Sequence, residues 1–273
     1  MEEGHVCVRR LLCLLLFMMD SSITIAAVIL SISLILSRVL YVIYWSGRPV
    51  RNKSLEPVST LIVLGSGGHT AEMLNVLSVL QKDLFAPRFY IAAATDNMSL
   101  QKARTYENQL ADKTGAEIDK IAQFMQIYRS REVGQSYFTS VWTTLIATLH
   151  ALWLMLKLRP QVILCNGPGT CIPLCVIAFI FKVQKCIELC ILLHFSQFQD
   201  HMVLEDNSGL NLNMQVMGIR WSSIFYVESI ARVKRLSLSG LILYELYMAD
   251  QFFVQWPQLQ RIYPRACYVG CLM

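Results

Sequence analysis

The stretch Thr60–Leu80, TLIVLGSGGHTAEMLNVLSVL, constrains the fold of this chain more than any other segment. Its apolar start, Leu61–Leu64, predicts a buried strand, and Ala71–Leu80 predicts an amphipathic helix. Between them lie Gly65, Ser66, Gly67, Gly68, His69 and Thr70. A helix that starts from such a turn offers unpaired backbone N–H groups to an anion. We therefore interpret the turn as a site for a diphosphate or sugar nucleotide, with a purely structural turn as the alternative.

The glycine spacing argues against two common nucleotide sites. Thr70 stands where the dinucleotide pattern needs its third glycine, and no Gly-Lys-Ser/Thr follows as in a P-loop. In addition, no acidic residue cleanly ends the second predicted strand, where the ribose of a dinucleotide binds. A nucleotide-dependent oxidoreductase is therefore disfavoured.

The N-terminal part of the chain predicts a membrane anchor. Hydrophobic residues make up 55% of the 273 residues, and the apolar span 23–45 is long enough to cross a hydrocarbon core. We therefore expect an N-terminal segment at 1–22, a single transmembrane helix at 23–45 and a linker at 46–58. The alternatives are a cleaved signal peptide with its apolar core at Leu11–Met19 and a two-segment arrangement broken at Asp20.

Charges and cysteines indicate the compartment. Arg48, Arg51 and Lys53 follow the span closely, which predicts a cytosolic domain, although Arg9 and Arg10 favour the reverse. The nine cysteines lack the spacing of a zinc site, so we interpret them as mostly buried, reduced thiols and expect no metal. The net charge of +5 comes without a dense Lys/Arg patch, which argues against a nucleic-acid partner.

From residue 59 to 273 short apolar runs alternate with helical stretches, which predicts one Rossmann-like, doubly wound parallel sheet. The expected strands are 61–64, 88–94, 121–128, 162–165, 224–227 and 251–255, and the expected helices are 71–80, 96–112, 136–158, 171–181 and 238–248. We expect helix 136–158 to lie mostly in the core, through a face with Trp142, Leu145, Leu149 and Leu152. An atypical insertion at 185–221 interrupts the alternation.

Ligands of doubly wound sheets bind beyond the carboxyl ends of the strands. The residues that we expect there are Gly65, Ser66, Gly67, Gly68, His69, Thr70, Asp96, Asn166, Gly167, Gly169, Thr170 and Glu228. Asp96 also suits a helix cap, which is its alternative role. Arg129 and Arg131 are candidates for neutralising a diphosphate, with a solvated basic loop as the alternative.

Several motifs, in order, resemble one family. They are GSGGHTAEM at 65–73, TDNMS at 95–99, RSREVGQSY at 129–137, LCNGPGTCIPLC at 164–175, YVESIARV at 226–233, LSLSG at 236–240 and VQWPQL at 254–259. They resemble the membrane-anchoring subunit of the eukaryotic UDP-N-acetylglucosamine transferase of the dolichol pathway. More distantly, they are similar to the acceptor half of the bacterial lipid-linked GlcNAc transferase. The insertion departs from the family pattern.

That resemblance implies the N-terminal half of a GT-B glycosyltransferase split over two chains. This chain is expected to bind GlcNAc-diphosphodolichol at the cytosolic face of the endoplasmic reticulum and to recruit a soluble catalytic subunit that binds UDP-GlcNAc. Together they would add the second GlcNAc of the N-glycan precursor, and this chain would be inactive alone. We expect no cofactor, and other early dolichol-pathway enzymes are further candidate partners. A non-catalytic membrane scaffold with a degenerate nucleotide-binding fold is the alternative.

His69 and Glu228 are the candidate catalytic residues. The imidazole of His69, beside the proposed diphosphate, can accept the proton of the acceptor sugar hydroxyl. The carboxylate of Glu228, at a strand end, can orient that hydroxyl or act as the base. The alternatives are a capping or hydrogen-bonding role for His69 and an ion pair between Glu228 and Arg232.

Overall fold

The computed structural model describes residues 57–114, 121–130, 135–167, 169–183 and 222–272, together with ten positions between Ile29 and Tyr44. The chain divides into two compact units, Met1–Val42 and Ile43–Met273. The ten positions are all helical. Most of the expected span 23–45, the segment 1–22, nearly all of the linker 46–58 and the insertion 185–221 lie outside the described residues, so these assignments stay predictions.

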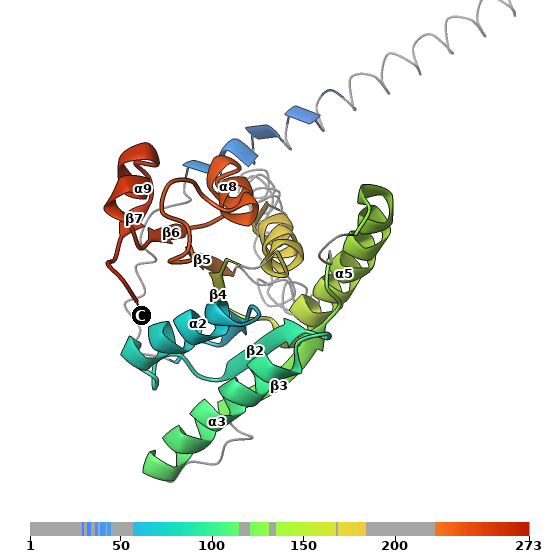
Figure 1. Cartoon of the computed structure of the whole chain (residues 1–273). Helices are drawn as coiled ribbons and strands as arrows, with labels where there is room; N and C mark the ends of the chain where they lie inside the picture. Colours follow the sequence, from blue (N-terminus) through green and yellow to red (C-terminus); the bar gives the residue numbers. More distant parts are fainter. Residues whose placement is uncertain are drawn as a thin grey trace, which may run out of the picture. The chain divides into compact units, whose positions relative to one another are not determined.

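Seven parallel strands form one sheet in the described part of the second unit, in the order β3-β2-β1-β4-β5-β6-β7 (Figure 1). They are β1 (Thr60–Val63), β2 (Arg88–Ala93), β3 (Ala122–Ile127), β4 (Val162–Asn166), β5 (Ser223–Val227), β6 (Gln251–Val254) and β7 (Cys267–Tyr268). The predicted doubly wound α/β fold is confirmed. The sequence did not indicate β7, because its two residues are too short to show a pattern.

Helices cover both faces of this sheet (Figure 1). They are α2 (Gly68–Val79), α3 (Asn97–Thr114), α5 (Tyr137–Leu158), the helix Cys171–Val183, α8 (Leu238–Glu245) and α9 (Pro257–Ile262). Alternate strand residues point to opposite faces. Ile62 and Tyr90 accordingly pack in one cluster with residues of α2 and α3. Leu61 and Ile91 pack in a second cluster with residues of α5, Cys171–Val183 and α8.

Helix α5 contradicts the expectation that its bulky face lies in the core. Trp142 and Leu149 are 68% and 59% exposed, whereas Ala147, Ala151 and Leu154 are buried. Thr144 lies three residues before Ala147 and seven before Ala151, on the same side of the helix, so polar residues do not mark the exposed face. The alanines let the helix axis approach the sheet closely, and the large side chains are left outside.

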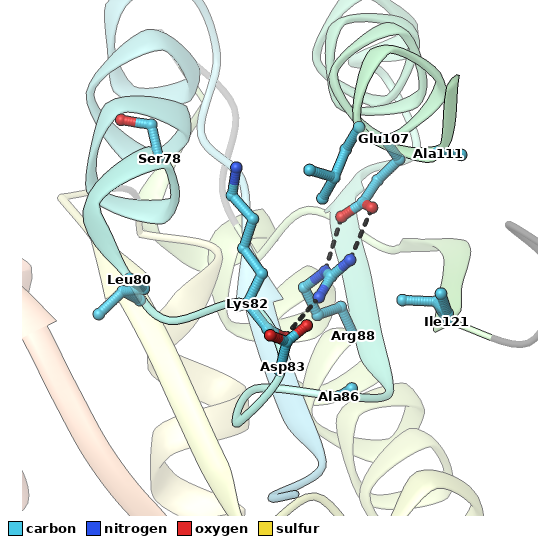
Figure 2. Close-up of a pocket in the computed structure, with 10 residues that line it drawn as sticks. Ser78, Leu80, Lys82, Asp83, Ala86, Arg88, Glu107, Ala111 and Ile121 are labelled. Carbon is cyan, nitrogen blue, oxygen red and sulfur yellow. Dashed lines mark hydrogen bonds and ion pairs between the residues drawn. The ribbon is translucent and has the colours of Figure 1, made fainter. Parts of the chain in front are cut away.

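A cavity of about 570 Å³ lies at the amino ends of β2 and β3, away from the glycine turn (Figure 2). Arg88 and Glu107 line it and form a bidentate ion pair, with Nε–Oε1 and Nη2–Oε2 distances of 2.7 and 2.8 Å. The Tyr90 hydroxyl also donates to Glu107, over 2.5 Å. Since Arg88 and Glu107 neutralise each other, we assign this ion pair to holding α3 on β2.

Candidate functional site

The glycine turn leaves the carboxyl end of β1 and enters α2 without a side-chain cap. Its N-cap residue, Gly67, has a φ of 64°, which glycine adopts without strain. A Cβ atom at Gly67 or Gly68 would meet no heavy atom within 4 Å, so the space above the turn is open. The first turn of α2 carries no acidic residue. Its N–H groups, which lack intrahelical acceptors, therefore offer an anion a favourable position.

Thr70 and Asp96 hold the base of this turn. The buried Thr70 hydroxyl donates to the carbonyl of Gly65, and its Oγ1 lies 2.7 Å from Oγ of Ser99. Ser99 in turn donates to Asp96 from its hydroxyl, over 2.6 Å, and from its backbone N–H, over 3.1 Å. Asp96 therefore caps α3, the alternative that its position favoured. Direct contact of Asp96 with a ligand stays a prediction.

His69 lies against the second glycine turn, which follows β4. Its Nδ1 is 3.4 Å from Oδ1 of Asn166. Gly167 has a φ of 63°, and a Cβ atom there would lie 2.6 Å from Cε1 of His69. Glycine at 167 thus satisfies the backbone and also leaves room for the imidazole. The first and second glycine turns, which are about a hundred residues apart in the sequence, therefore lie side by side at the same edge of the sheet.

Glu72 is a functional candidate that the sequence analysis missed. It lies on α2, one turn after His69, and is 2% exposed. Its Oε2 accepts from Nδ2 of Asn166 over 2.9 Å, and its Oε1 accepts from the Ser229 hydroxyl over 3.0 Å. Glu72 thereby ties α2 to the carboxyl ends of β4 and β5. An acidic residue beside the sheet-facing Met73, within the GSGGHTAEM motif, was the available signal.

Glu228 is fully buried at the end of β5. Its Oε2 accepts from the backbone N–H and the hydroxyl of Ser237, over 3.0 and 3.1 Å, and its Oε1 accepts from the Ser229 N–H over 3.2 Å. Burial raises the pKa of Glu228, and the hydrogen bonds from Ser237 and Ser229 act in the opposite direction. Ser237 caps α8, so Glu228 joins β5 to that helix. Its expected role as a base stays a prediction.

The remaining candidates surround the second turn. Gly169 is exposed, Thr170 is buried, and the Ser130 hydroxyl donates to the Gly169 carbonyl over 3.3 Å. Ser130 and the half-buried Arg129 follow β3, so this loop reaches the same edge of the sheet. Arg131 lies outside the described residues. The structure therefore brings together the candidates of β1, β2, β4 and β5, and the loop after β3 joins them through Ser130.

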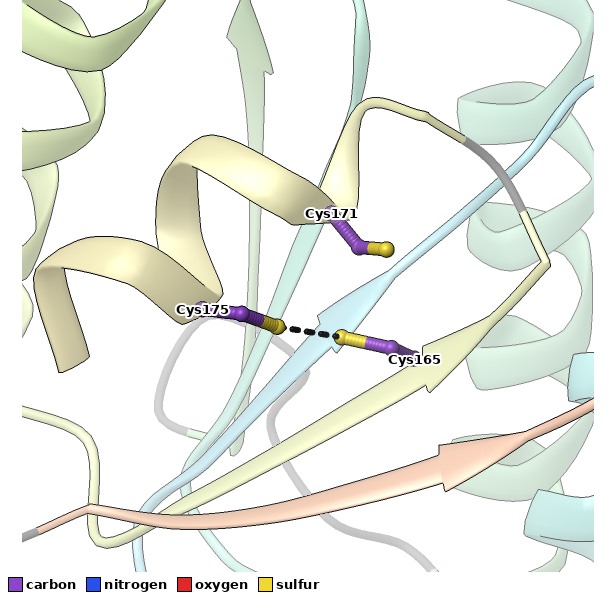
Figure 3. Close-up of side chains that lie close together, drawn as sticks. All are labelled: Cys165, Cys171 and Cys175. Carbon is purple, nitrogen blue, oxygen red and sulfur yellow. Dashed lines mark hydrogen bonds between the residues drawn. The ribbon is translucent and has the colours of Figure 1, made fainter. Parts of the chain in front are cut away.

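Three buried cysteines form a separate group beneath this edge (Figure 3). The sulfur atoms of Cys165, Cys171 and Cys175 lie within 4.8 Å of one another, and those of Cys165 and Cys175 are 3.7 Å apart. Structural zinc takes four ligands, and this group of described residues offers three. They agree with the expected buried thiols, whereas Cys267 and Cys271 are exposed.

Comparisons with known proteins place the chain in a family. A family model described as "Oligosaccharide biosynthesis protein Alg14 like" matches residues 60–272, from β1 to beyond β7. The human "UDP-N-acetylglucosamine transferase subunit ALG14" is 38% identical over 219 residues, which are 79% of this chain and 83% of the human protein. The protein of that name from Yarrowia lipolytica is 38% identical over 258 residues, which are 93% of this chain and 100% of that protein.

Among solved structures, the crystal structure of Acinetobacter baumannii MurG aligns with a TM-score of 0.41 and 14% identity, over 74% of this chain and 42% of that chain. The family assignment rests on the sequence matches, and the region that the family model matches includes both glycine turns and the end of β5. This chain is a member of the Alg14 family.

Proposed function

We propose that this chain is the membrane-bound, acceptor-binding subunit of a two-chain UDP-N-acetylglucosamine transferase. The enzyme adds the second GlcNAc to GlcNAc-diphosphodolichol at the cytosolic face of the endoplasmic reticulum. The name shared by the relatives supports transfer of GlcNAc by a multi-subunit enzyme. The observation that carries the acceptor role is the uncapped turn at Gly67 and Gly68, with open space above it and His69 beside it.

The acceptor diphosphate binds to the N–H groups at the start of α2 in this proposal. Backbone donors and the helix dipole stabilise its charge, and Arg129 and Arg131 add cationic contacts. The sugar then lies next to His69, whose imidazole accepts the proton of the attacking hydroxyl. Asn166 orients that imidazole, and Glu72 holds Asn166 in place.

The donor belongs to a second chain in this proposal. The described residues of the second unit form a single sheet, and a transfer between two large substrates needs a wall on each side of the reacting atoms. We assign the UDP-GlcNAc wall to a soluble catalytic subunit that this chain recruits to the membrane. Other early dolichol-pathway enzymes are further partners in this proposal.

The surface that receives the catalytic subunit is an apolar pocket of about 290 Å³ between α2 and the C-terminal segment. Its lining includes Val76 and Val79 of α2, Phe225 and Phe253 of the sheet, and Leu272. Val79 is 81% exposed. A Val79→Asp change is expected to abolish co-purification of the catalytic subunit, because it places a charge in this pocket. The neighbouring, exposed Ser78→Asp is the matched control, and equal recruitment by both variants would exclude this surface.

GlcNAc transfer to a short-chain GlcNAc-diphospho-lipid tests the acceptor role. Membranes carrying this chain are assayed with and without the soluble subunit, and activity is expected with both chains only. His69→Ala is expected to lower kcat by about 10²- to 10⁴-fold, the usual contribution of a general base, without loss of subunit recruitment. Asn75→Ala, an exposed change farther along α2, is the control. Full transfer by His69→Ala would leave the non-catalytic scaffold as the better description.

A further inference from the structure

The three buried cysteines beneath the second glycine turn lie close enough together to surround one atom (Figure 3). We call Cys165, Cys171 and Cys175 the thiol trio. All three are 0% exposed, and their sulfur atoms lie within 4.8 Å of one another, with 3.7 Å between those of Cys165 and Cys175. Three sulfur ligands about 2.3 Å from a central atom lie at most about 4.0 Å from one another. Small side-chain rotations therefore suffice to bring the trio around one atom.

The fold holds the trio in this arrangement. Cys165 lies in the central strand β4, whereas Cys171 and Cys175 are four residues apart on one side of the helix Cys171–Val183. All three belong to the core cluster on this face of the sheet. Since the sulfur atoms are already positioned by the core, a ligand does not have to order three flexible side chains, which favours binding.

Charge decides which central atom suits the trio. Three thiolates carry three negative charges, so a monovalent copper ion would leave two of them uncompensated and a divalent zinc ion would leave one. The buried cation on the same helix, Lys182, is paired with Asp250. An uncompensated charge in the interior is strongly unfavourable. Among the described residues, no further His, Cys, Asp or Glu ligand atom belongs to the group, so zinc lacks a fourth ligand there. A trivalent atom on three thiolates is neutral and needs no fourth ligand.

We propose that the thiol trio is a binding site for trivalent arsenic, taken up as arsenous acid, As(OH)₃. At each cysteine an arsenic–sulfur bond forms and an arsenic–oxygen bond breaks, and the thiol proton leaves with the hydroxyl group as water. Three thiols thus release three water molecules and yield a neutral arsenic tris(thiolate). Neither arsenic nor sulfur changes its oxidation state.

Arsenic in the trio would also act on the second glycine turn. It would bond β4 to the helix that begins at Cys171, and so link the two ends of this turn. Cys165 directly precedes Asn166, whose Oδ1 lies 3.4 Å from Nδ1 of His69. Drawing the three sulfur atoms together therefore shifts the Asn166 amide relative to the imidazole. We expect bound arsenic to inhibit GlcNAc transfer; this expectation rests on the proposed function, whereas the binding site itself does not.

The test measures arsenite binding to the purified full chain in detergent, with an excess of glutathione to keep isolated thiols free of arsenic. One arsenic per chain is expected, and the mass of the intact protein should rise by one arsenic atom minus three hydrogen atoms. Cys171→Ala is expected to weaken binding about 10²- to 10⁴-fold, because the third sulfur otherwise binds intramolecularly. Cys267→Ala with Cys271→Ala is the matched control, since these thiols are exposed, and it should bind arsenic as the wild type does.

A second variant keeps only the trio, so that the test does not depend on the folding of a chain with an altered core. Its six other cysteines are replaced by alanine, namely Cys7, Cys13, Cys186, Cys190, Cys267 and Cys271. One arsenic with loss of three hydrogen atoms is expected here as well. Absence of arsenic from the wild type would overturn the proposal, as would undiminished binding by Cys171→Ala. Binding of one zinc ion by the trio-only chain, in preference to arsenic, would also overturn it, in favour of a four-ligand site.

Transfer measurements separate this inference from the proposed function. The chain is loaded with arsenite, freed of the excess and then mixed with the soluble subunit, so that only arsenic on this chain acts. Transfer is expected to fall for the wild type and for the trio-only chain, and a dithiol that extracts the arsenic should restore it. Bound arsenic without any effect on transfer would refute the link to the glycine turn. Bound arsenic in a chain that shows no transfer even before loading would refute the proposed function and leave the arsenic site standing.

Discussion

A Gly167→Ala change tests whether His69 occupies the place that the structure gives it. The new Cβ atom would lie 2.6 Å from Cε1 and 2.8 Å from Nδ1 of His69, at a φ of 63°. The left-handed backbone costs about 1–2 kcal/mol with a side chain present. Overpacking against the ring costs about 1–3 kcal/mol more. We therefore expect a loss of about 2–5 kcal/mol, or a displaced imidazole that has left Oδ1 of Asn166.

The His69→Ala background separates these two costs. Without the imidazole, the methyl group at 167 meets no ring, so only the backbone cost remains. The double-mutant cycle should therefore give a coupling of about 1–3 kcal/mol between the two positions. Gly169→Ala is the control, because its Cβ atom would meet nothing closer than 3.9 Å, and Gly169 lies outside the left-handed region.

Urea-dependent proteolysis of the full chain in detergent measures these stabilities, and GlcNAc transfer with the soluble subunit measures the site. Gly167→Ala should lower transfer more than Gly169→Ala does. An equal cost of Gly167→Ala in both backgrounds, within the roughly 0.5 kcal/mol expected of independent sites, would refute the contact between His69 and Gly167. Normal transfer by Gly167→Ala with a displaced ring would refute the catalytic role of His69.

Four further substitutions concern buried charged residues. Because the pKa of Glu228 is raised, its contribution to stability is complete below the ordinary value of 4.5 and falls as the pH rises through the folded-state value. Glu228→Gln should therefore lack this decline in urea unfolding measured from pH 4.5 upward, and retained transfer would contradict catalysis by the carboxylate. Lys182→Met should lower the free energy of unfolding by about 3–5 kcal/mol in the same assay, since it leaves its buried partner Asp250 without that cation. Adding Asp250→Asn to the Lys182→Met variant should recover part of this loss of stability. Glu72→Gln should lower kcat about tenfold to a hundredfold while membrane attachment persists, because an amide cannot accept through both of its ends and Asn166 shifts.

The sequence predicted the sheet well because its signals are local. Each expected strand appears within about two residues of its position, since a short apolar run bounded by turns marks a buried parallel strand. Helix α2 begins at Gly68, three residues before the expected Ala71, because glycines inside a turn conceal the start of the helix. The sequence analysis missed helix α9 and strand β7, because a six-residue helix and a two-residue strand are stabilised by packing against the rest of the domain and show no pattern of their own.

The sequence predicted which edge of the sheet carries the candidate site, but it did not predict the hydrogen bonds between the side chains there. Strand ends could be read from the sequence, and the turns at Gly67 and Gly167 do meet there. Glu72 could not be found in this way, because its partners Asn166 and Ser229 are 94 and 157 residues away. The same limit applies to Glu228, whose local alternative was an ion pair with Arg232. Nothing in the local pattern indicates that its carboxylate turns inward to Ser237.

Helix α5 shows why an apolar pattern can be assigned to the wrong face. Where the polar side chains of a helix mark its exposed side, water identifies the outside; in α5 the polar Thr144 lies on the same side as the buried Ala147 and Ala151, so side-chain size decides instead. Ala147 and Ala151, four residues apart, form the strip that approaches the sheet most closely, because bulky residues there would hold the helix away. The large side chains at Trp142 and Leu149 are then placed outside by packing, not by solvent.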